Sequence, residues 1–514
     1  MKKTKLFACL AAGVITLGML PALSASAATE ERLVGYRGDV NGDMQVDLSD
    51  VLLLMQHLTA VETLPDEAHA DKADMDRSGT IDARDLTLLK RAAMGISEPE
   101  GIYETVEIEE QTIDAPVNAV NPTLTSKGEA RLLMMIVEFP DYKFKQQYSA
   151  EDIRKIAFGE SDPDSRYYPQ ESVRGYYERA SYGALTMEAD IYTYTMPRES
   201  EYYVRVYSNG KRYGDTAKLA DAVMSAFDDQ IDFNRYDGNG DHVMDTLVIS
   251  VADTAPDDGW WPCSNDYFGN QRYDGVSPGN VIVGNCSPSN PADYNKTWIH
   301  ELGHAMGLPD YYKYENVQDG YYGLNGPAGT EMMDDAVGDM CAFSKLMYGW
   351  YTPSQIQVYE GGTQTYTLRS SQTAGNCVVI PRGDLNGYLS EFFILEYATL
   401  EGNNAIWWVF DSQKEGGLRV LHAEASVSNG NWGPEFSWSN YAKYYDSSNQ
   451  KQRVLRLVNE KEGGKFFTAG DQVTSSLSGF HWYDGSGYQT VDPQVKITGD
   501  SVADGVLTVT VSQG

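Results

Sequence analysis

Basic residues are scarce in this chain of 514 residues. Lys and Arg together number 40, against 74 Asp and Glu, so the formal net charge is -34 at pH 7. Such an excess of negative charge argues against nucleic acid as a partner, because the phosphates would be repelled. Charged residues make up 22% and hydrophobic residues 42% of the chain, so most of it is expected to fold rather than remain disordered.

Cysteine is also rare, with five in the whole chain. Cys9 lies in an N-terminal segment that we expect to be removed, and no other cysteine precedes Cys263. A propeptide cysteine that guards a metal is therefore not expected. Four cysteines remain: Cys263, Cys286, Cys341 and Cys377. An even number in an exported chain predicts one or two disulfides, although the spacing does not define their pairing.

Long apolar runs are missing beyond the N-terminus. No later run approaches the ~20 apolar residues of a membrane helix, so no membrane partner is expected. Residues 1–27 combine three early lysines, an apolar run and an Ala-Ser-Ala ending. That layout predicts a secretory signal and hence a secreted, extracellular protein. The length predicts two to four domains.

An internal repeat follows the signal. GDVNGDMQVDLSDVLLLMQHL (residues 38–58) returns 35 residues later as ADMDRSGTIDARDLTLLKRAA (residues 73–93). Each copy places oxygen-bearing side chains at positions 1, 3, 5, 9 and 12 of a calcium loop, with a backbone carbonyl at position 7. The first loop would use Asp39, Asn41, Asp43, Gln45, Asp47 and Asp50. The second loop would use Asp74, Asp76, Ser78, Thr80, Asp82 and Asp85. One such loop could be a solvated acidic turn, but two in tandem favour calcium binding.

Apolar residues at helical spacing follow each loop. A pair of calcium loops with one helix each resembles a dockerin type I module, and the resemblance covers residues 36–96. It implies a small all-α calcium-binding module whose partner is the cohesin module of a scaffoldin. The positions that meet cohesin in that family correspond to Leu48, Ser49, Ala83 and Arg84. The two copies differ there, so equal use of both faces is not expected. The acidic, proline-containing residues 97–125 are expected to form a linker with a short strand at residues 103–108.

The stretch TWIHELGHAMGLPDYY (residues 297–312) carries the chemistry. His300 and His304 are four residues apart, so both imidazoles lie on one helix face and can bind one zinc ion. Glu301 can accept a proton from the attacking water as general base. Gly307 allows a turn that brings Asp310 back as the third ligand, which leaves one position open for water. HExxH also occurs in helices without metal, but the downstream Gly and Asp favour zinc.

HELGHAMGLPD fits the metzincin scheme HExxHxxGxxH with Asp310 in place of the last histidine. It resembles the immune-inhibitor-A family of secreted bacterial metalloproteases, and three blocks agree: RLLMMIVEFPD, SVRGYYERASYGALTMEADIYTYTMP and TEMMDDAVGDMCAFSKLMYGWYTP. The resemblance implies an α+β zincin or metzincin-like catalytic domain, expected at residues 126–352. It also implies that Met333, or alternatively Met332, lies beneath the metal. In some metzincins a tyrosine two residues after this Met holds the oxyanion. Here that position is Asp335, so the resemblance assigns no helper.

Two further features belong to the same region. By the resemblance, NVIVGNC (residues 280–286) is expected to be the sheet edge that pairs with substrate. DGNGDHVMD resembles a third calcium loop, with Asp237, Asn239, Asp241, Val243 and Asp245 as ligands. Position 12 of this loop is Val248, so a further ligand would come from elsewhere, such as Asp232. The alternative is a plain turn.

Residues 353–514 show short alternating strands separated by turn residues, which predicts a C-terminal antiparallel β domain. His422 in one of these strands is expected to be hydrogen-bonded rather than a metal ligand. The tryptophans and tyrosines of this region suit core packing, although they could also stack on sugar rings.

The sequence therefore predicts a multidomain, secreted, cellulosome-associated zinc endopeptidase that acts on protein near plant polysaccharide. Peptide bonds would be hydrolysed by zinc-activated water with Glu301 as general base. One alternative is an inactive peptidase-like binding component of a cellulosome, but the intact HExxH argues against it. A carbohydrate-active enzyme is the other, and no carboxylate pair stands out for it.

Overall fold

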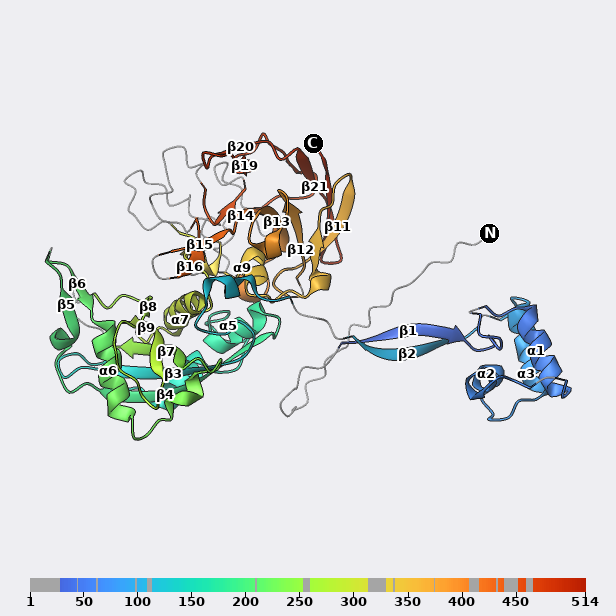
Figure 1. The fold of residues 1–514 in the computed structure, drawn as a ribbon, viewed down its shortest axis with the longest axis horizontal. Coiled ribbons are helices and arrows are strands. Elements are labelled where there is room, and N and C mark those ends of the chain that lie inside the picture. Colours follow the sequence, from blue (N-terminus) through green and yellow to red (C-terminus); the bar gives the residue numbers. More distant parts are fainter. Residues whose placement is uncertain are drawn as a thin grey trace. The chain divides into compact units, whose positions relative to one another are not determined.

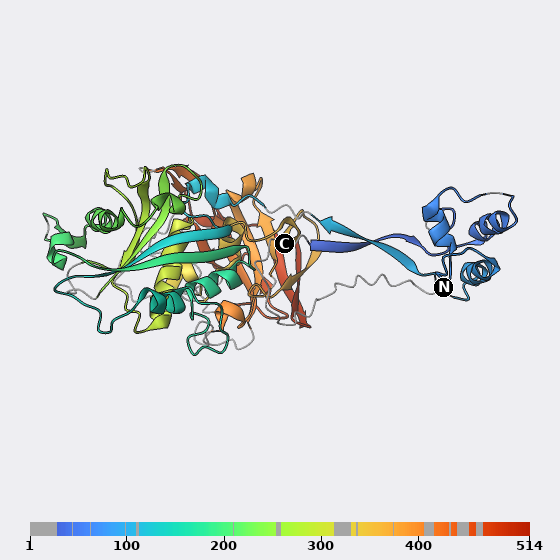
Figure 2. The ribbon, with the colours of Figure 1, turned by 90° about the horizontal axis from the view of Figure 1, so that it is seen from below.

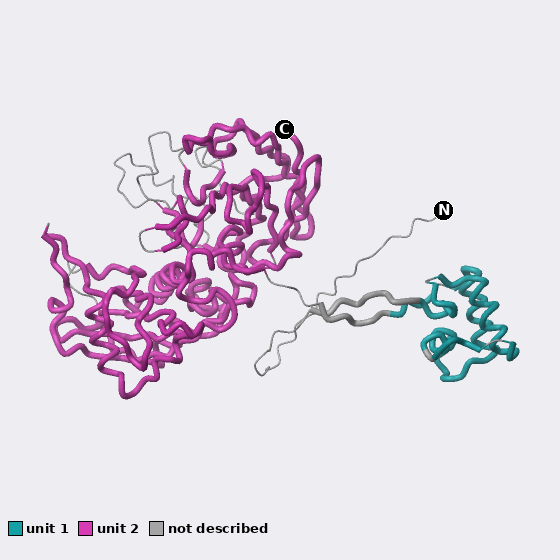
Figure 3. Tube along the Cα trace, in the orientation of Figure 1, with its two compact units in different colours: residues 1–111 teal, residues 112–514 magenta. Residues whose placement is uncertain are grey.

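The computed structural model divides into two compact units, Met1–Gln111 and Thr112–Gly514, which we describe separately (Figure 3). The residues that the structure describes are 28–43, 45–61, 63–97, 99–108, 113–208, 210–252, 259–312, 330–335, 338–373, 375–405, 416–430, 433–438, 452–458 and 466–514. The expected signal, residues 1–27, lies outside them. Within these ranges, no helix is both long enough and apolar enough to cross a membrane.

The first unit is built from three helices and one strand pair. Its elements are α1 (Leu48–Leu58), α2 (Glu67–Ala73), α3 (Ala83–Ala93), β1 (Ala28–Tyr36) and β2 (Gly101–Ile108). β1 pairs with β2 in antiparallel fashion (Figure 1), so the strand expected at residues 103–108 belongs to a two-stranded ribbon. The small core consists of Val40, Val51, Leu54, Ala73 and Leu89.

The same acidic residues that were expected to bind calcium also start two of these helices. Asp47 caps α1 by accepting from the Ser49 amide, and Asp50 completes the capping box. Asp82 and Asp85 do the same for α3. A side-chain cap of this kind stabilises a helix by about 1 kcal/mol, so the loop sequence by itself favours both helices.

The second unit begins with a five-stranded sheet in the order β4-β3-β7-β9-β8 (Figure 2). The strands are β3 (Gly128–Glu138), β4 (Leu185–Thr195), β7 (Val243–Val251), β8 (Cys263–Asp266) and β9 (Ser277–Gly284). The strands β4, β3, β7 and β9 are parallel, and β8 pairs with β9 in antiparallel fashion at the edge. In β3, successive residues such as Leu132 and Leu133 point to opposite faces of the sheet and enter different cores, as a buried parallel strand requires.

Helices cover both faces of this sheet. The face that contains Leu132 packs on α4 (Ala150–Ala157), α5 (Val173–Ala180) and α7 (Pro291–Ala305). The opposite face packs on α6 (Thr216–Phe227). α7 lies between the sheet and the C-terminal strands (Figure 1), so the HExxH motif is held between two layers.

Most of the remaining described strands form two larger sheets, with the orders β10-β12-β13-β14-β17 and β11-β22-β21-β18, and the pairs β5-β6, β15-β16 and β19-β20 form two-stranded sheets. The first comprises β10 (Ile356–Val358), β12 (Cys377–Pro381), β13 (Glu391–Ala398), β14 (Gly417–Glu424) and β17 (Leu455–Leu457). The second comprises β11 (Gln364–Arg369), β18 (Gln472–Val473), β21 (Val495–Ala503) and β22 (Val506–Gln513). All pairings are antiparallel except that of β10 with β12.

The C-terminal strands share a core with the helices of the first sheet. Val379 and Ile394 pack in the same cluster as Ile299 of α7 and Phe343 of α9 (Ala342–Met347). Their neighbours Val378 and Leu395 face the four-stranded sheet instead. The five-stranded C-terminal sheet therefore belongs to two cores at once.

Two expectations are wrong for physical reasons. Residues 113–125 do not form a linker, because Val117 and Leu124 are buried in the core that surrounds α7. The amides of Thr123 and Leu124 both donate to the carbonyl of Ala305 at 3.0 Å, which ties this segment to the end of that helix.

The expected disulfides are also wrong, because none of the four described cysteines forms a disulfide. Cys263 packs against the core on the α6 face, whereas Cys286 packs against the core on the α7 face, so the sheet separates the two sulfur atoms.

Candidate metal and catalytic site

The helix that carries the motif is set by its buried face and by the glycine after it. Trp298, Ile299 and Leu302 are buried on α7. Gly307 follows the helix at φ +107°, a conformation that side chains rarely adopt, and its amide donates to the His304 carbonyl at 2.8 Å. A Cβ at this glycine would lie 3.1 Å from Val117. The sequence Gly-Leu-Pro-Asp thus ends α7 and turns the chain back over the histidines.

His300, His304 and Asp310 converge at this turn. The Nε2 atoms of His300 and His304 lie 2.9 Å and 3.2 Å from Oδ1 of Asp310. The Nδ1 atoms are each held by a backbone carbonyl at 2.8 Å, Met332 for His300 and Leu308 for His304. Because each Nδ1–H is used in this way, both Nε2 atoms face the carboxylate. One atom of each residue lies within 4.8 Å of the other two, and a donor set of two imidazoles and one carboxylate suits zinc.

The electrostatics of the cluster agree with a cation site. Burial alone would raise the pKa of Asp310, but the charge of His304 and the hydrogen bond from His300 lower it far below its usual value. Burial opposes protonation of His304, yet Asp310 raises the pKa of that imidazole to about 9. Glu301 is also buried, and burial raises its pKa, although the two histidines partly oppose this. Without an ion, a protonated histidine supplies the positive charge next to Asp310. A bound cation would supply that charge instead.

Met333 packs directly under the active helix, on α8 (Met332–Asp335). A Cβ at Gly303 would lie 2.4 Å from Sδ of Met333, so the sulfur atom touches α7 between the two histidines. The carbonyl of Met333 accepts from the Tyr311 amide at 2.8 Å. The neighbouring Met332 instead supplies the carbonyl that orients His300. Of the two candidates, Met333 therefore lies against the helix.

Sequence reasoning missed two residues of this site. Tyr312 stacks on His300 with ring centroids 6.0 Å apart at 24°, and its hydroxyl hydrogen-bonds Asp310. Glu331 is fully buried, where its carboxylate accepts from the amides of Met333 and Cys341 and from the Ser344 hydroxyl. The adjacency of Tyr312 to the third ligand is a sequence signal for the first. The second depends on contacts across the fold and leaves no such signal.

The two repeated loops differ in geometry. Carboxylate oxygens of Asp74, Asp76 and Asp85 lie within 4.8 Å of one another. Ser78 donates its hydroxyl hydrogen to the Thr80 carbonyl at 3.1 Å, so both belong to the same turn. Asp82, at the end of this loop, is occupied as the cap of α3.

In the first loop, no three acidic side chains approach one another so closely among the described residues. Asp39 is fully buried, one of its oxygens accepts from Lys72 at 2.9 Å, and the other has no hydrogen-bond partner. An unpartnered buried carboxylate oxygen fits calcium well. The side chains of the other expected ligands accept from backbone amides of the same loop. Asn41 accepts from the amide of Asp43, and Asp43 accepts from the amide of Gln45. Asp50 accepts from the amides of Asn41 and Asp47.

The third candidate loop is also folded around its acidic side chains. Asp237 accepts from the amides of Gly240, Asp241 and His242, and Asn239 accepts from Asp241. Asp241 in turn accepts from the amide of Val243 at 2.8 Å. Burial and the charges of Asp237 and Asp241 raise the pKa of Asp245 to about 6.

Asp232 is used elsewhere, since it caps the short helix Phe233–Tyr236. A cavity of about 380 Å³ brings Asn118 and Asn121 to Asn239, Asp241 and Asp245 instead. If the loop binds calcium, these amides are better placed than Asp232 to complete it.

The expected substrate edge is wrong. β9 contains residues 280–284 and pairs with β7 on one side and β8 on the other, so it is an inner strand. The edge of the sheet is β8, the short polar segment Cys263–Asp266. A short polar strand has none of the apolar pattern that identifies strands from sequence, which explains the error.

Comparison with known families gives a match for the repeated loops and a match for the segment that contains the HExxH helix. Residues 37–92 match the family model of the dockerin type I domain, and residues 274–331 match that of peptidase M66. A comparison with curated proteins gives no match. The M66 segment contains β9, α7 and the turn to Asp310. The two resemblances seen in the sequence are thereby confirmed: one part of the chain matches the dockerin type I domain, and another part matches peptidase M66, an immune-inhibitor-A-like metalloprotease family.

Proposed function

We propose that this protein is a secreted, cellulosome-associated zinc endopeptidase. The observation that carries the proposal is the convergence of His300, His304 and Asp310 beside Glu301, a residue of the same helix. Three protein ligands with one open position are the donor set of catalytic zinc. Zinc held there would polarise the scissile carbonyl and make water a better nucleophile at neutral pH.

Glu301 is the proposed general base. Its carboxylate is buried, and burial raises its pKa above that of an exposed glutamate, which makes it a stronger base for the proton of water. The helix that carries Glu301 packs against the edge strand β8, which is where a peptide bond would have to lie.

A metzincin-like class is supported by several features together. They are the HExxHxxGxxD sequence, a mixed sheet with an antiparallel edge strand, an active helix packed on that sheet, and Met333 under the histidines. We propose residues 126–352 as the catalytic domain and residues 353–514 as the β-rich C-terminal domain. The buried segment 113–125 belongs with the former rather than with a linker.

The first unit is proposed to bind two calcium ions and one cohesin. The dockerin match supports both, and the carboxylates of the second loop already converge. Leu48 is 71% exposed at the start of α1, which suits one of the proposed cohesin contacts. Ser49, Ala83 and Arg84 complete that set, and Arg84 pairs with Asp76 at 3.1 Å.

The test is cleavage of unfolded casein by the purified full chain, with and without a zinc chelator. Glu301→Gln is compared with Asp293→Asn, a control in the first turn of the same helix. We expect chelator-sensitive cleavage that is lost in Glu301→Gln and kept in Asp293→Asn. Equal cleavage by Glu301→Gln would remove this residue from its role. Absence of cleavage by the unaltered chain would favour the inactive, binding alternative.

A further inference from the structure

The free edge of β8 lies beside the proposed base. β8 pairs with β9 through Cys263↔Val283 and Ser264↔Ile282, and no other strand pairs with it among the described residues. The helix α7, which carries Glu301, packs against β8, so the unpaired edge of this strand lies beside that helix. An extended polypeptide added to this edge would pass the catalytic carboxylate.

Alternate residues of β8 face opposite sides of the sheet. Ser264 lies opposite Ile282, whose side chain is in the core on the α7 side. Cys263 and Asn265 lie opposite Val283 and Val281, which are in the core on the α6 side. A strand added to β8 would alternate in the same way, because cross-strand neighbours share a face. The residues next to the one that faces Glu301 would therefore point to the α6 side.

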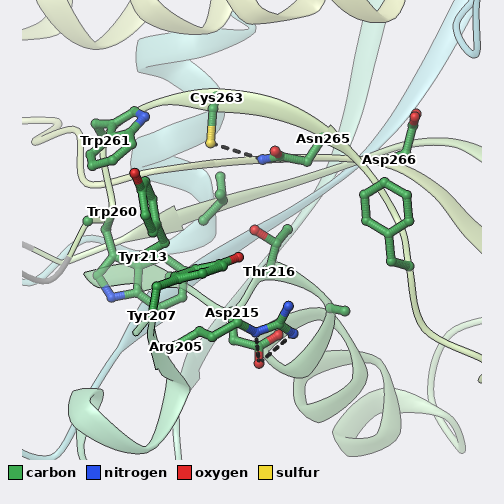
Figure 4. Close-up of a pocket in the computed structure, with 15 residues that line it drawn as sticks. Arg205, Tyr207, Tyr213, Asp215, Thr216, Trp260, Trp261, Cys263, Asn265 and Asp266 are labelled. Atoms are coloured by element: carbon green, nitrogen blue, oxygen red, sulfur yellow. Dashed lines mark hydrogen bonds and ion pairs between the residues drawn. The ribbon is translucent and has the colours of Figure 1, made fainter. Parts of the chain in front are cut away.

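A cavity of about 350 Å³ lies on that side, at the edge of β8 (Figure 4). Its walls are aromatic: Tyr207 and Tyr213 come from the hairpin of β5 (Val204–Val206) and β6 (Arg212–Gly214), and Trp261 and Phe268 flank β8. The ring of Tyr213 stands edge-on to Tyr207 at 5.3 Å and to Trp261 at 5.2 Å. Trp261 is 52% exposed and Phe268 68%, so both rings have faces available to a ligand.

The aromatic wall is built on close backbone packing. Trp260 is buried against Gly214, where a Cβ would lie 2.3 Å from the indole. The Gly214 amide donates to the Gly259 carbonyl at 3.3 Å, and Gly259 has φ +70°. These glycines allow the hairpin to lie directly on the segment that leads into β8. The cavity is therefore fixed relative to the edge strand.

Two of the three charged side chains that line the cavity compensate each other. Arg205 pairs with Asp215 at 3.0 Å, and Asp215 also caps α6. A basic substrate side chain would meet the guanidinium of Arg205, and an acidic one would meet the negative charge of Asp266 on β8. Flat aromatic faces around a compensated ion pair favour a neutral aromatic side chain.

We propose that this cavity is a specificity subsite that takes an aromatic side chain of an extended protein substrate bound along β8. The aromatic residue would be the neighbour of the substrate residue that faces Glu301, and hence within two residues of the cleaved bond. This proposal rests on the proposed peptidase function.

The test uses the full chain and matched fluorogenic peptides that differ only in Phe, Ala or Lys at each position around the cleaved bond. We expect kcat/KM to be about 10–100-fold higher for Phe than for Ala at one position, as burial of one aromatic side chain allows. In Trp261→Ala this Phe-to-Ala ratio should fall close to 1, and Trp261→Phe should keep most of it. Tyr202→Ala, which removes an exposed aromatic ring outside the cavity, should keep the full ratio.

The outcomes separate the two proposals. Cleavage without aromatic preference, a preference for Lys, or a ratio that Trp261→Ala leaves intact would overturn the subsite while the peptidase stands. No cleavage of any peptide would overturn the peptidase. In that event, fluorescence titration with the Phe peptide decides whether the cavity binds aromatic side chains, since Trp261→Ala should weaken binding about tenfold relative to the Ala peptide. Equal binding of both peptides would overturn the cavity assignment as well.

Discussion

His300 and His304 are each oriented by a backbone carbonyl on Nδ1, and this is what directs both Nε2 atoms at Asp310. The spacing of HExxH predicted the shared helix face, and the glycine predicted the turn. The sequence could not show that the carbonyls of Met332 and Leu308 complete the arrangement, because one of them comes from a segment more than thirty residues away. For the same reason Glu331 emerged only from the three-dimensional contacts, whereas Tyr312 lies two residues after Asp310 and could have been noticed in the sequence.

Tyr312→Phe should weaken zinc binding. The hydroxyl of Tyr312 hydrogen-bonds Asp310, and loss of such a contact to a ligand lowers metal affinity by about 10–100-fold. Competition with a chromophoric chelator measures this affinity in the full chain. Tyr202→Phe, on an exposed ring away from the site, serves as control. An unchanged affinity in Tyr312→Phe would show that the hydroxyl does not orient Asp310.

Glu331 should make the second unit lose stability as the pH rises. Burial raises its pKa from 4.5 to about 7, so the folded state holds a proton that the unfolded chain has released above about pH 4.5. The contribution is complete below pH 4.5 and is lost as the pH rises through 7, at up to about 1.4 kcal/mol per pH unit. Calorimetry at pH 5, 6 and 7 should show the Tm of the unaltered chain falling relative to Glu331→Gln. A Tm of the unaltered chain that rises with pH relative to that of Glu331→Gln would contradict this sign.

Among the elements, strong local patterns were predictive and short polar strands were not. The apolar spacing after each duplicated loop indicated α1 and α3, and the structure adds that aspartates that fit calcium also cap these helices. Residues 280–284 were recognised as a strand, but their continuous apolar run is typical of an inner parallel strand, not of an edge. β8 went unrecognised because four residues with polar side chains carry no periodic signal.

Calcium removal should unfold the first unit and leave the second intact. The first unit has a core of only a few side chains, and its clustered carboxylates repel one another without a cation. Hydrogen exchange of the full chain should show loss of protection in α1 and α3 after chelation of calcium, with β3 and β7 unchanged. Asp85→Ala should reproduce much of this loss at saturating calcium. Protection that persists in the chelated chain would contradict calcium-dependent folding.

At the scale of the whole molecule, the chain divides into two units, although the sequence predicted separate catalytic and C-terminal β domains after the dockerin-like module. The first unit was anticipated from its repeat. The continuity of the second was not, because packing between α7 and the C-terminal strands has no sequence signature. Arg419 of β14 shows the connection: its guanidinium is fully buried, pairs with Glu396 at 2.6 Å and donates to the Thr330 carbonyl at 2.9 Å. The start of the segment that contains Met332 and Met333 is thus held by the β-rich region.

Truncation should reveal this dependence. A chain that ends at residue 352 would expose the apolar face that normally packs on Val379 and Ile394, so we expect it to aggregate or to unfold without a cooperative transition. Removal of residues 28–111 should leave the Tm of the second unit unchanged, because that unit has its own cores. Size-exclusion chromatography and calorimetry distinguish the two. A monomeric, cooperatively folded chain ending at residue 352 would show that the catalytic part is independent.

Anomalous scattering at the zinc edge decides whether His300, His304 and Asp310 hold zinc. Crystals of the full chain grown with zinc should give one strong anomalous peak about 2.0–2.2 Å from Nε2 of both histidines and from a carboxylate oxygen of Asp310. The absence of any peak at this position in zinc-soaked crystals would contradict the account.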